Sequence, residues 1–114
     1  MDENNELVSV SMNIILNAGD GRTEAFKALE EARKGNFEEA ANKIKLAEEK
    51  IKAAHVAQTE VMQNEINGKT YDLCILFIHA QDTLMTIKSE LSLITEMIEM
   101  YKDIDALKKE QSCH

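Results

Sequence analysis

The chain has 114 residues, with 21 acidic and 13 basic side chains and a formal net charge of -8 at pH 7. This length suits one domain of ordinary size, and the acidic balance argues against nucleic acid as a partner, because phosphate backbones attract basic surfaces. There is no proline, and residues that favour helices dominate, so we expect an all-α protein.

The sequence also indicates a compartment. No stretch is long and apolar enough to cross a bilayer, and residues 1–6 lack the basic start of a signal peptide. Cys74 and Cys113 do not form a disulfide framework, and we expect Cys74 to be a small buried hydrophobic residue. We therefore expect a cytoplasmic protein with no direct membrane insertion.

The first helix is expected from about Asn4 to Lys34, with a weak point at residues 17–21. Glycine-rich turns before helices can hold phosphate, but this one lacks the preceding strand and the lysine of a Walker motif. We expect a helix kink here, or a break capped by Asp20 or Thr23.

The second helix is delimited by glycines. Gly35 is expected to cap the first helix, and Asn36 is a suitable N-cap for the second, with Glu39 at capping-box spacing. The helix should end near Ile66, where Asn67-Gly68 is a turn signal. Its apolar positions alternate in steps of three and four: Phe37, Ala40, Ile44, Ala47, Ile51, Ala54 and Val61.

The third helix is expected from about Thr70 to Lys109 and carries two apolar stripes. The first suits packing inside a bundle: Leu73, Phe77, Ala80, Leu84, Ile87, Leu91, Ile94, Ile98 and Tyr101. The second consists of Ile75, Ile78, Asp82, Met85, Ser89, Leu93, Met97 and Met100. A helix of a small monomer needs only one apolar face, so the second stripe predicts oligomerisation.

His79 and Asp82 stand out within this most apolar part of the chain. They lie one helical turn apart. An unpaired polar group is costly to bury. A helix histidine is commonly a packed structural residue, but imidazole also serves as a nucleophile or proton carrier near neutral pH. Asp82 lies on the second stripe. Its copies in a symmetric oligomer would meet, and a hard cation such as Mg²⁺ would relieve their repulsion.

Two further polar residues belong to the second helix. His55 is either a structural histidine or a neighbour of the site, and the sequence leaves both readings open. Gln58 occupies a core-facing position, where we expect it to form a hydrogen bond across the bundle or to a site residue.

Three blocks together resemble one family. His79-Ala80-Gln81-Asp82-x-Leu84-Met85-Thr86 is similar to the active-site signature of the IIA components of the lactose/cellobiose class of the bacterial phosphoenolpyruvate-dependent sugar phosphotransferase system (PTS). Asn17-Ala18-Gly19-Asp20-Gly21-Arg22 and Ala54-His55-x-x-Gln58-Thr59 agree with the same family. The blocks occur in the family's order and spacing, over about Leu7 to Tyr101.

The resemblance implies an antiparallel three-helix bundle that assembles as a homotrimer of nine helices, with residues 1–114 as one domain and a flexible C-terminal end at 103–114. His79 matches the residue that accepts phosphate from the carrier protein HPr, as tele-phosphohistidine, and passes it to a cysteine of the cognate IIB during uptake of a β-linked disaccharide. Asp82 matches the ligand of one Mg²⁺ per trimer, on the trimer axis. Gln81, Thr83 and His55 are implied to be near the site.

One position departs from the family pattern. Family members often have a second histidine directly after the aspartate, where this chain has Thr83. Two other functions are compatible with the residues alone: a histidine phosphotransfer domain of two-component signalling, and a non-catalytic helical oligomerisation module. The transported sugar is not readable, although Ala80 favours the cellobiose/chitobiose branch.

Overall fold

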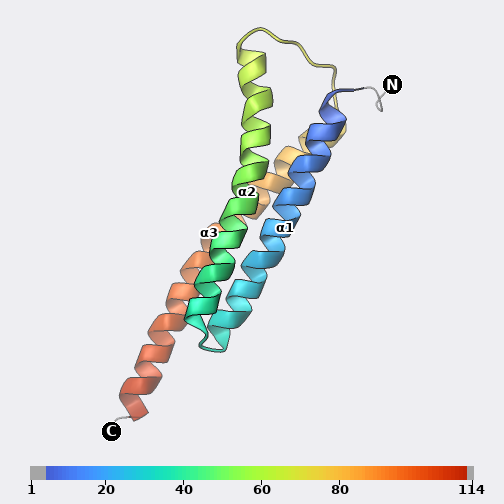
Figure 1. Cartoon of the computed structure of the whole chain (residues 1–114). Helices are drawn as coiled ribbons and strands as arrows, with labels where there is room; N and C mark the ends of the chain where they lie inside the picture. Colours follow the sequence, from blue (N-terminus) through green and yellow to red (C-terminus); the bar gives the residue numbers. More distant parts are fainter. Residues whose placement is uncertain (1–4, 113–114) are drawn as a thin grey trace.

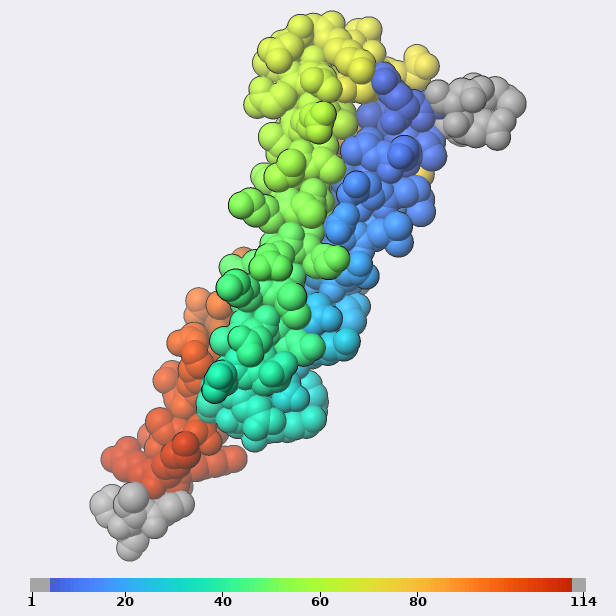
Figure 2. Space-filling view, viewed as in Figure 1, coloured from blue at the N-terminus to red at the C-terminus, as the bar shows by residue number. Residues whose placement is uncertain are grey.

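The computed structural model describes residues 5–112 as three long helices: α1 Leu7–Arg33, α2 Phe37–Ile66 and α3 Ile75–Ser112. Over this range there is no strand, so the expected all-α helical bundle is confirmed. The molecule is a rod of 68 × 24 × 18 Å (Figures 1 and 2). Consecutive helices run in opposite directions, so α1 and α3 run in the same direction (Figure 1). The predicted helix start at Asn4 and the last two residues of the predicted C-terminal end, Cys113 and His114, lie outside the described residues.

Helix α1 is continuous, so of the two alternatives predicted for residues 17–21 the break is wrong, and the kink stays a prediction. The two glycines are helical, and the Thr23 hydroxyl donates to the Gly19 carbonyl 3.1 Å away instead of capping a new helix. Gly21 is buried against α2, where an added Cβ would lie 2.7 Å from Cγ1 of Ile51. The second glycine of this block therefore serves close helix packing and does not interrupt the helix.

The turn between α1 and α2 follows the predicted glycine. Gly35 has a φ of +87°, and the Gly35 and Asn36 amides donate to the carbonyls of Ala32 and Glu31 at 3.0 and 2.9 Å. Asn36 is the N-cap of α2, as predicted, but its side chain forms no capping hydrogen bond. The predicted capping box with Glu39 is therefore wrong, because the side-chain amide of Asn36 donates to the Glu31 carboxylate instead.

The predicted start of the third helix at Thr70 is wrong by five residues, since α3 begins at Ile75. Residues 69–74 form an extended linker that crosses from the end of α2 to the start of α3, beside the N-terminal end of α1 (Figure 1). The Asn5 side-chain amide donates to the carbonyls of Asp72 and Leu73, both at 3.2 Å. Those carbonyls are thus used by a tertiary contact rather than by a helix.

The core follows the first stripe of α3. Phe77, Ala80, Leu84, Ile87, Ile94 and Ile98 are buried, whereas Leu91 and Tyr101 are half-buried. Leu73 precedes the helix and is exposed, so its assignment to this stripe is wrong. The apolar positions predicted for α2 pack from the other side, with Ala40, Ala47, Ile51, Ala54 and Val61 buried and Phe37 and Ile44 half-buried. Small alanines on α1 and α2 let the helices approach closely.

The second stripe of α3 is exposed along its whole length. Its large apolar members all lie on the surface of the single chain: Ile75, Ile78, Met85, Leu93, Met97 and Met100. Ile104 and Leu107 continue it beyond the predicted range. An exposed apolar surface this long is typical of a helix that another chain covers.

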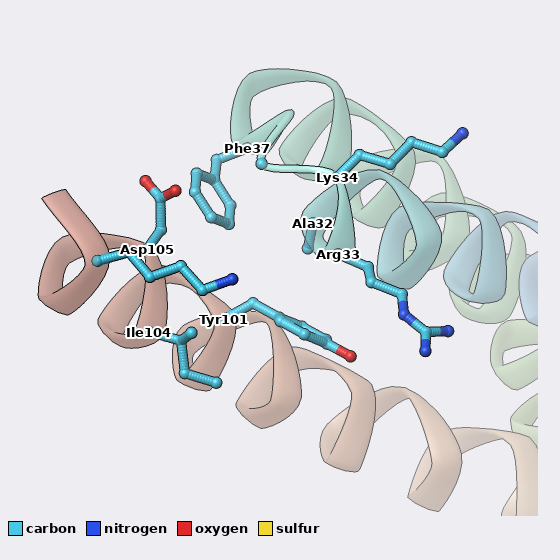
Figure 3. Close-up of a pocket in the computed structure, with 9 residues that line it drawn as sticks. Ala32, Arg33, Lys34, Phe37, Tyr101, Ile104 and Asp105 are labelled. Atoms are coloured by element: carbon cyan, nitrogen blue, oxygen red, sulfur yellow. The ribbon is translucent and has the colours of Figure 1, made fainter. Parts of the chain in front are cut away.

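Helix α3 continues past the α1–α2 turn, and residues 103–112 are helical (Figure 1). That these residues form a flexible end stays a prediction. Where α3 passes the turn, an open cavity of about 550 Å³ lies between the end of α1 and α3 (Figure 3). Phe37 and Tyr101 line it, together with Arg33, Lys34 and Asp105. This cavity is at the opposite end of the rod from the His79–Asp82 segment.

Candidate active site

His79 lies in the second turn of α3, near the end of the bundle where the linker meets α1. Its side chain is exposed, although Ala80 beside it is fully buried. Among the described residues, no hydrogen bond or ion pair involves the imidazole. The exposed ring is therefore carried on a helix and has no hydrogen-bond or ion-pair partner among the described residues.

Thr83 shares the face of His79, whereas Gln81 does not. Thr83 follows His79 by four residues, so the two side chains are neighbours on the helix surface, and Thr83 is half-buried. Gln81 is only two residues away, which places it about 200° around the helix. It lines a cavity of about 240 Å³ with Tyr71, Cys74 and Ile78. Within one chain, the predicted site residues Gln81 and His79 thus lie on opposite sides of α3.

Asp82 is exposed on the second stripe, between Ile78 and Met85. It forms no ion pair or hydrogen bond with the residues described here. Over residues 5–112, no group of three or more His, Cys, Asp or Glu lies together in a way that could hold a metal ion.

His55 lies halfway along α2 and contacts α3. Its Nδ1 is 3.4 Å from Nζ of Lys88. Because a lysine ammonium can only donate, Nδ1 of His55 acts as the acceptor in this contact. Lys88 follows His79 by nine residues, about 13 Å along the helix. The structure therefore does not bring His55 to His79 within one chain. Gln58, one turn on, is buried as expected for a core-facing position, but its side chain forms no hydrogen bond with the described residues, so the predicted hydrogen bond is wrong.

Two contacts mark the borders of the exposed stripe. On one side, which we call the His79 flank (His79, Thr83, Thr86 and Glu90), Glu90 pairs with Arg22 of α1 at 2.8 Å. On the other side, which we call the Gln81 flank (Gln81 and Lys88), Lys88 contacts His55 of α2. The stripe is thus bordered by α1 on one side and by α2 on the other.

The linker before the site is held by a polar cluster that sequence reasoning missed. Nζ of Lys69 is 3.2 Å from the Glu6 carboxylate and 4.9 Å from the centre of the Tyr71 ring. Nδ2 of Asn64 donates to the Tyr71 hydroxyl at 2.9 Å. The Glu6 carboxylate raises the pKa of Lys69 above its usual 10.5. No sequence motif predicts this cluster, because its members meet only when α1 and the linker pack together.

Helix α3 contains the most apolar part of the chain, yet no helix within residues 5–112 is both long and apolar enough to span a membrane.

The comparisons with known proteins identify the family. The family described as PTS system, Lactose/Cellobiose specific IIA subunit, matches residues 9–102. The lichenan-specific phosphotransferase enzyme IIA component of Bacillus subtilis (strain 168) is 39% identical over 101 residues, which cover 89% of this chain and 92% of that protein. The N,N'-diacetylchitobiose-specific EIIA component of Escherichia coli (strain K12) is 33% identical, covering 91% and 90%.

Solved structures agree. The PTS cellobiose specific enzyme IIA from Bacillus anthracis has a TM-score of 0.82 at 38% identity, covering 86% of this chain and 90% of that one. The IIA(Chitobiose)–HPr complex of the Escherichia coli phosphotransferase system gives 0.75 at 32% identity, covering 88% and 97%. The chain belongs to the lactose/cellobiose-specific IIA subunits of the PTS, and it is a phosphotransferase component.

Proposed function

We propose that His79 is the phosphoryl carrier of this subunit. It accepts phosphate from phosphorylated HPr, as tele-phosphohistidine, and passes it to a cysteine of the cognate IIB during uptake of a β-linked disaccharide of the cellobiose, chitobiose or lactose type. The protein would act in the cytoplasm, where HPr and IIB present their phosphorylated side chains. HPr is supported as partner by the similar chitobiose IIA, which was solved in complex with HPr.

The observation that carries this proposal is the state of the His79 side chain. It is exposed, mounted on the rigid second turn of α3, and free of hydrogen bonds to the residues described. A structural histidine would be buried and hydrogen-bonded. A relay residue must instead be reached by two partner proteins in turn, and positioning on a helix supplies the geometry that phosphoryl transfer requires.

The transfer balances simply. The Nε2 lone pair of neutral His79 forms a bond to phosphorus while the bond from phosphorus to the HPr histidine nitrogen breaks, and that nitrogen keeps the electron pair. In the second transfer the IIB thiolate forms a bond to phosphorus while the bond from phosphorus to Nε2 of His79 breaks, and His79 leaves as neutral imidazole. Thr83, one turn on, is close enough along the helix to offer its hydroxyl to a phosphoryl oxygen.

We further propose that three chains assemble around the exposed stripe of α3, giving a bundle of nine helices. The stripe runs from Ile75 to Met100 on one face of the helix, and its large apolar side chains are exposed in the single chain. Burial of this much apolar surface is the dominant driving force for association. The stripe also passes through Asp82, so three carboxylates would meet near the axis.

Asp82 fits a magnesium site in such a trimer. Its carboxylate offers the oxygen ligands that Mg²⁺ prefers, and it is left without a cationic partner by the described residues of its own chain. Three copies and water would complete one site per trimer. The ion would neutralise the like charges and so hold the three helices together at this level.

The experiment is to incubate the protein with phosphoenolpyruvate, enzyme I and HPr and to measure acid-labile phosphate on the chain by mass spectrometry. We expect one phosphate per chain, none on His79→Ala, and wild-type labelling on His55→Ala. Phosphate that persists after His79→Ala would refute the assignment. A subsequent chase with the cognate IIB should empty the His79 site.

A further inference from the structure

Gly19 has no structural reason to be glycine within its own chain. It lies in the middle of α1, where glycine is among the least favourable residues. A Cβ built on it would meet nothing within 4 Å, in contrast to Gly21, whose Cβ would collide with Ile51. Its φ is an ordinary helical one, so no left-handed conformation requires it either. The space outside Gly19 is open in the single chain.

Exposed apolar side chains lie on the same face of α1 as Gly19. Met12 and Phe26 lie seven residues before and after it, which places the three on one line along α1. Both side chains are exposed, and Leu16 beside them is 61% exposed. A glycine between two large exposed apolar residues leaves a notch in which another backbone can approach closely.

The borders of the α3 stripe determine what can fill this notch. The stripe has α1 on one side, through the Arg22–Glu90 pair, and α2 on the other, through the contact of Lys88 with His55. In a ring of three copies about the stripe, each copy contacts one neighbour through one surface and the other neighbour through a different surface. The α1 side of one copy must therefore meet the α2 side of the next.

We propose that Gly19 is the close-contact point between α1 of one chain and α2 of the next chain in the trimer. This inference rests on the proposed trimer. Gly21 lies level with Ile51 in the chain, so Gly19 lies level with Ala53 of the antiparallel α2. Rotation about an axis along the stripe does not change the position of a residue along the length of the bundle. The next chain therefore presents its exposed Lys52 and His55 to Gly19. The aliphatic stem of Lys52 can cover the notch while its ammonium reaches water.

The two glycines provide a matched pair of variants. Gly19→Ala should raise the melting temperature of dissociated chains by about 3 °C, because alanine favours the helix. It should also raise the concentration at which trimers dissociate by at least about tenfold, as followed by analytical ultracentrifugation across a dilution series. Gly21→Ala should lower the melting temperature through its clash with Ile51.

A disulfide tests the contact directly. The double variant Gly19→Cys and Lys52→Cys, in a Cys113→Ser background, should give oxidised dimers and trimers on a non-reducing gel, whereas each single variant should not. An unchanged dissociation concentration in Gly19→Ala, or no linked species in the double variant, overturns the inference.

The outcomes also separate this inference from the proposed function. A wild type that stays monomeric at all concentrations overturns both the trimer and the role of Gly19. Phosphorylation of His79 would remain measurable in that case. A stable wild-type trimer with unaffected Gly19→Ala overturns only the role of Gly19.

Discussion

Arg22 of α1 and Glu90 of α3 are 68 residues apart in the chain and form an ion pair of 2.8 Å between Nη2 and Oε2. The pair joins the two parallel helices at Glu90, the last residue of the His79 flank. The other carboxylate oxygen of Glu90, Oε1, is buried and has no hydrogen-bond partner among the described residues. The negative charge of the Glu90 carboxylate is therefore compensated mainly by Arg22.

This dependence predicts an asymmetric response to mutation. Arg22→Ala leaves a partly buried carboxylate uncompensated, and we expect a loss of about 1–2 kcal/mol in the free energy of unfolding. Glu90→Gln in the Arg22→Ala background should recover most of the loss, because the buried charge is removed. Urea denaturation measures both. The control is Lys102→Ala, which removes an exposed i,i+3 pair with Glu99 and should cost under about 0.5 kcal/mol. Equal losses in Arg22→Ala and Lys102→Ala would contradict the dependence.

The proposed metal site predicts a stoichiometry. Wild-type protein dialysed against Mg²⁺ should retain about one ion per three chains, following the proposed set of one Asp82 from each chain. Elemental analysis should find none in Asp82→Leu, which has no oxygen ligand but is apolar like the rest of the stripe. Asp103→Leu changes the charge equally at an exposed position about 31 Å further along α3 and should keep the ion. Equal metal content in the two variants would exclude Asp82 as the ligand.

Thr83 predicts a moderate kinetic effect. If its hydroxyl bonds a phosphoryl oxygen, Thr83→Val should slow transfer from phosphorylated HPr by about two- to tenfold, the value of one hydrogen bond. Rapid-quench measurement of the transfer rate is the test. Thr95→Val removes a hydroxyl that donates only to the Leu91 carbonyl, further along α3, and should leave the rate unchanged. A Thr83→Val rate equal to wild type would remove Thr83 from the site.

Lys69 predicts a pH dependence with a defined sign. Its pKa is raised in the folded state by the Glu6 carboxylate, so its charged form favours folding. This contribution is fully present below the unfolded pKa of 10.5 and is lost as pH rises above it through the folded pKa. The difference in melting temperature between wild type and Lys69→Met should therefore shrink above about pH 10.5. Lys45→Met, at an exposed position of α2, controls for the titration of the other lysines and tyrosines. A difference that grows with pH would reverse the assigned sign.

The helix boundaries show where local signals suffice. Gly35 and Gly68 end α1 and α2 as predicted, with φ of +87° and +100°, because only glycine adopts this conformation without strain. The predicted helix start at Thr70 and the predicted break at residues 17–21 are wrong, because tertiary contacts override local preference there. The Asn5 amide occupies the linker carbonyls before Ile75, and packing against Ile51 keeps Gly21 inside a continuous helix.

The candidate site shows the same division. The spacing of His79, Thr83 and Asp82 within a helical pattern predicted which residues share a face, because helical periodicity is a local property. Neither the Arg22–Glu90 pair nor the Lys69 cluster has a local signal, since each joins segments more than 60 residues apart. Nor could periodicity show that His55 lies beside Lys88 rather than His79.

The sequence by itself determined the number of helices, the two stripes of α3 and the position of the one histidine that lies between them. It did so because glycine punctuation and apolar spacing act over one or two turns. Only the tertiary structure decided which helix borders each side of the exposed stripe. That order depends on how the linker of residues 69–74 returns the chain to α1, and it places Gly19 and His79 on the same side of the molecule.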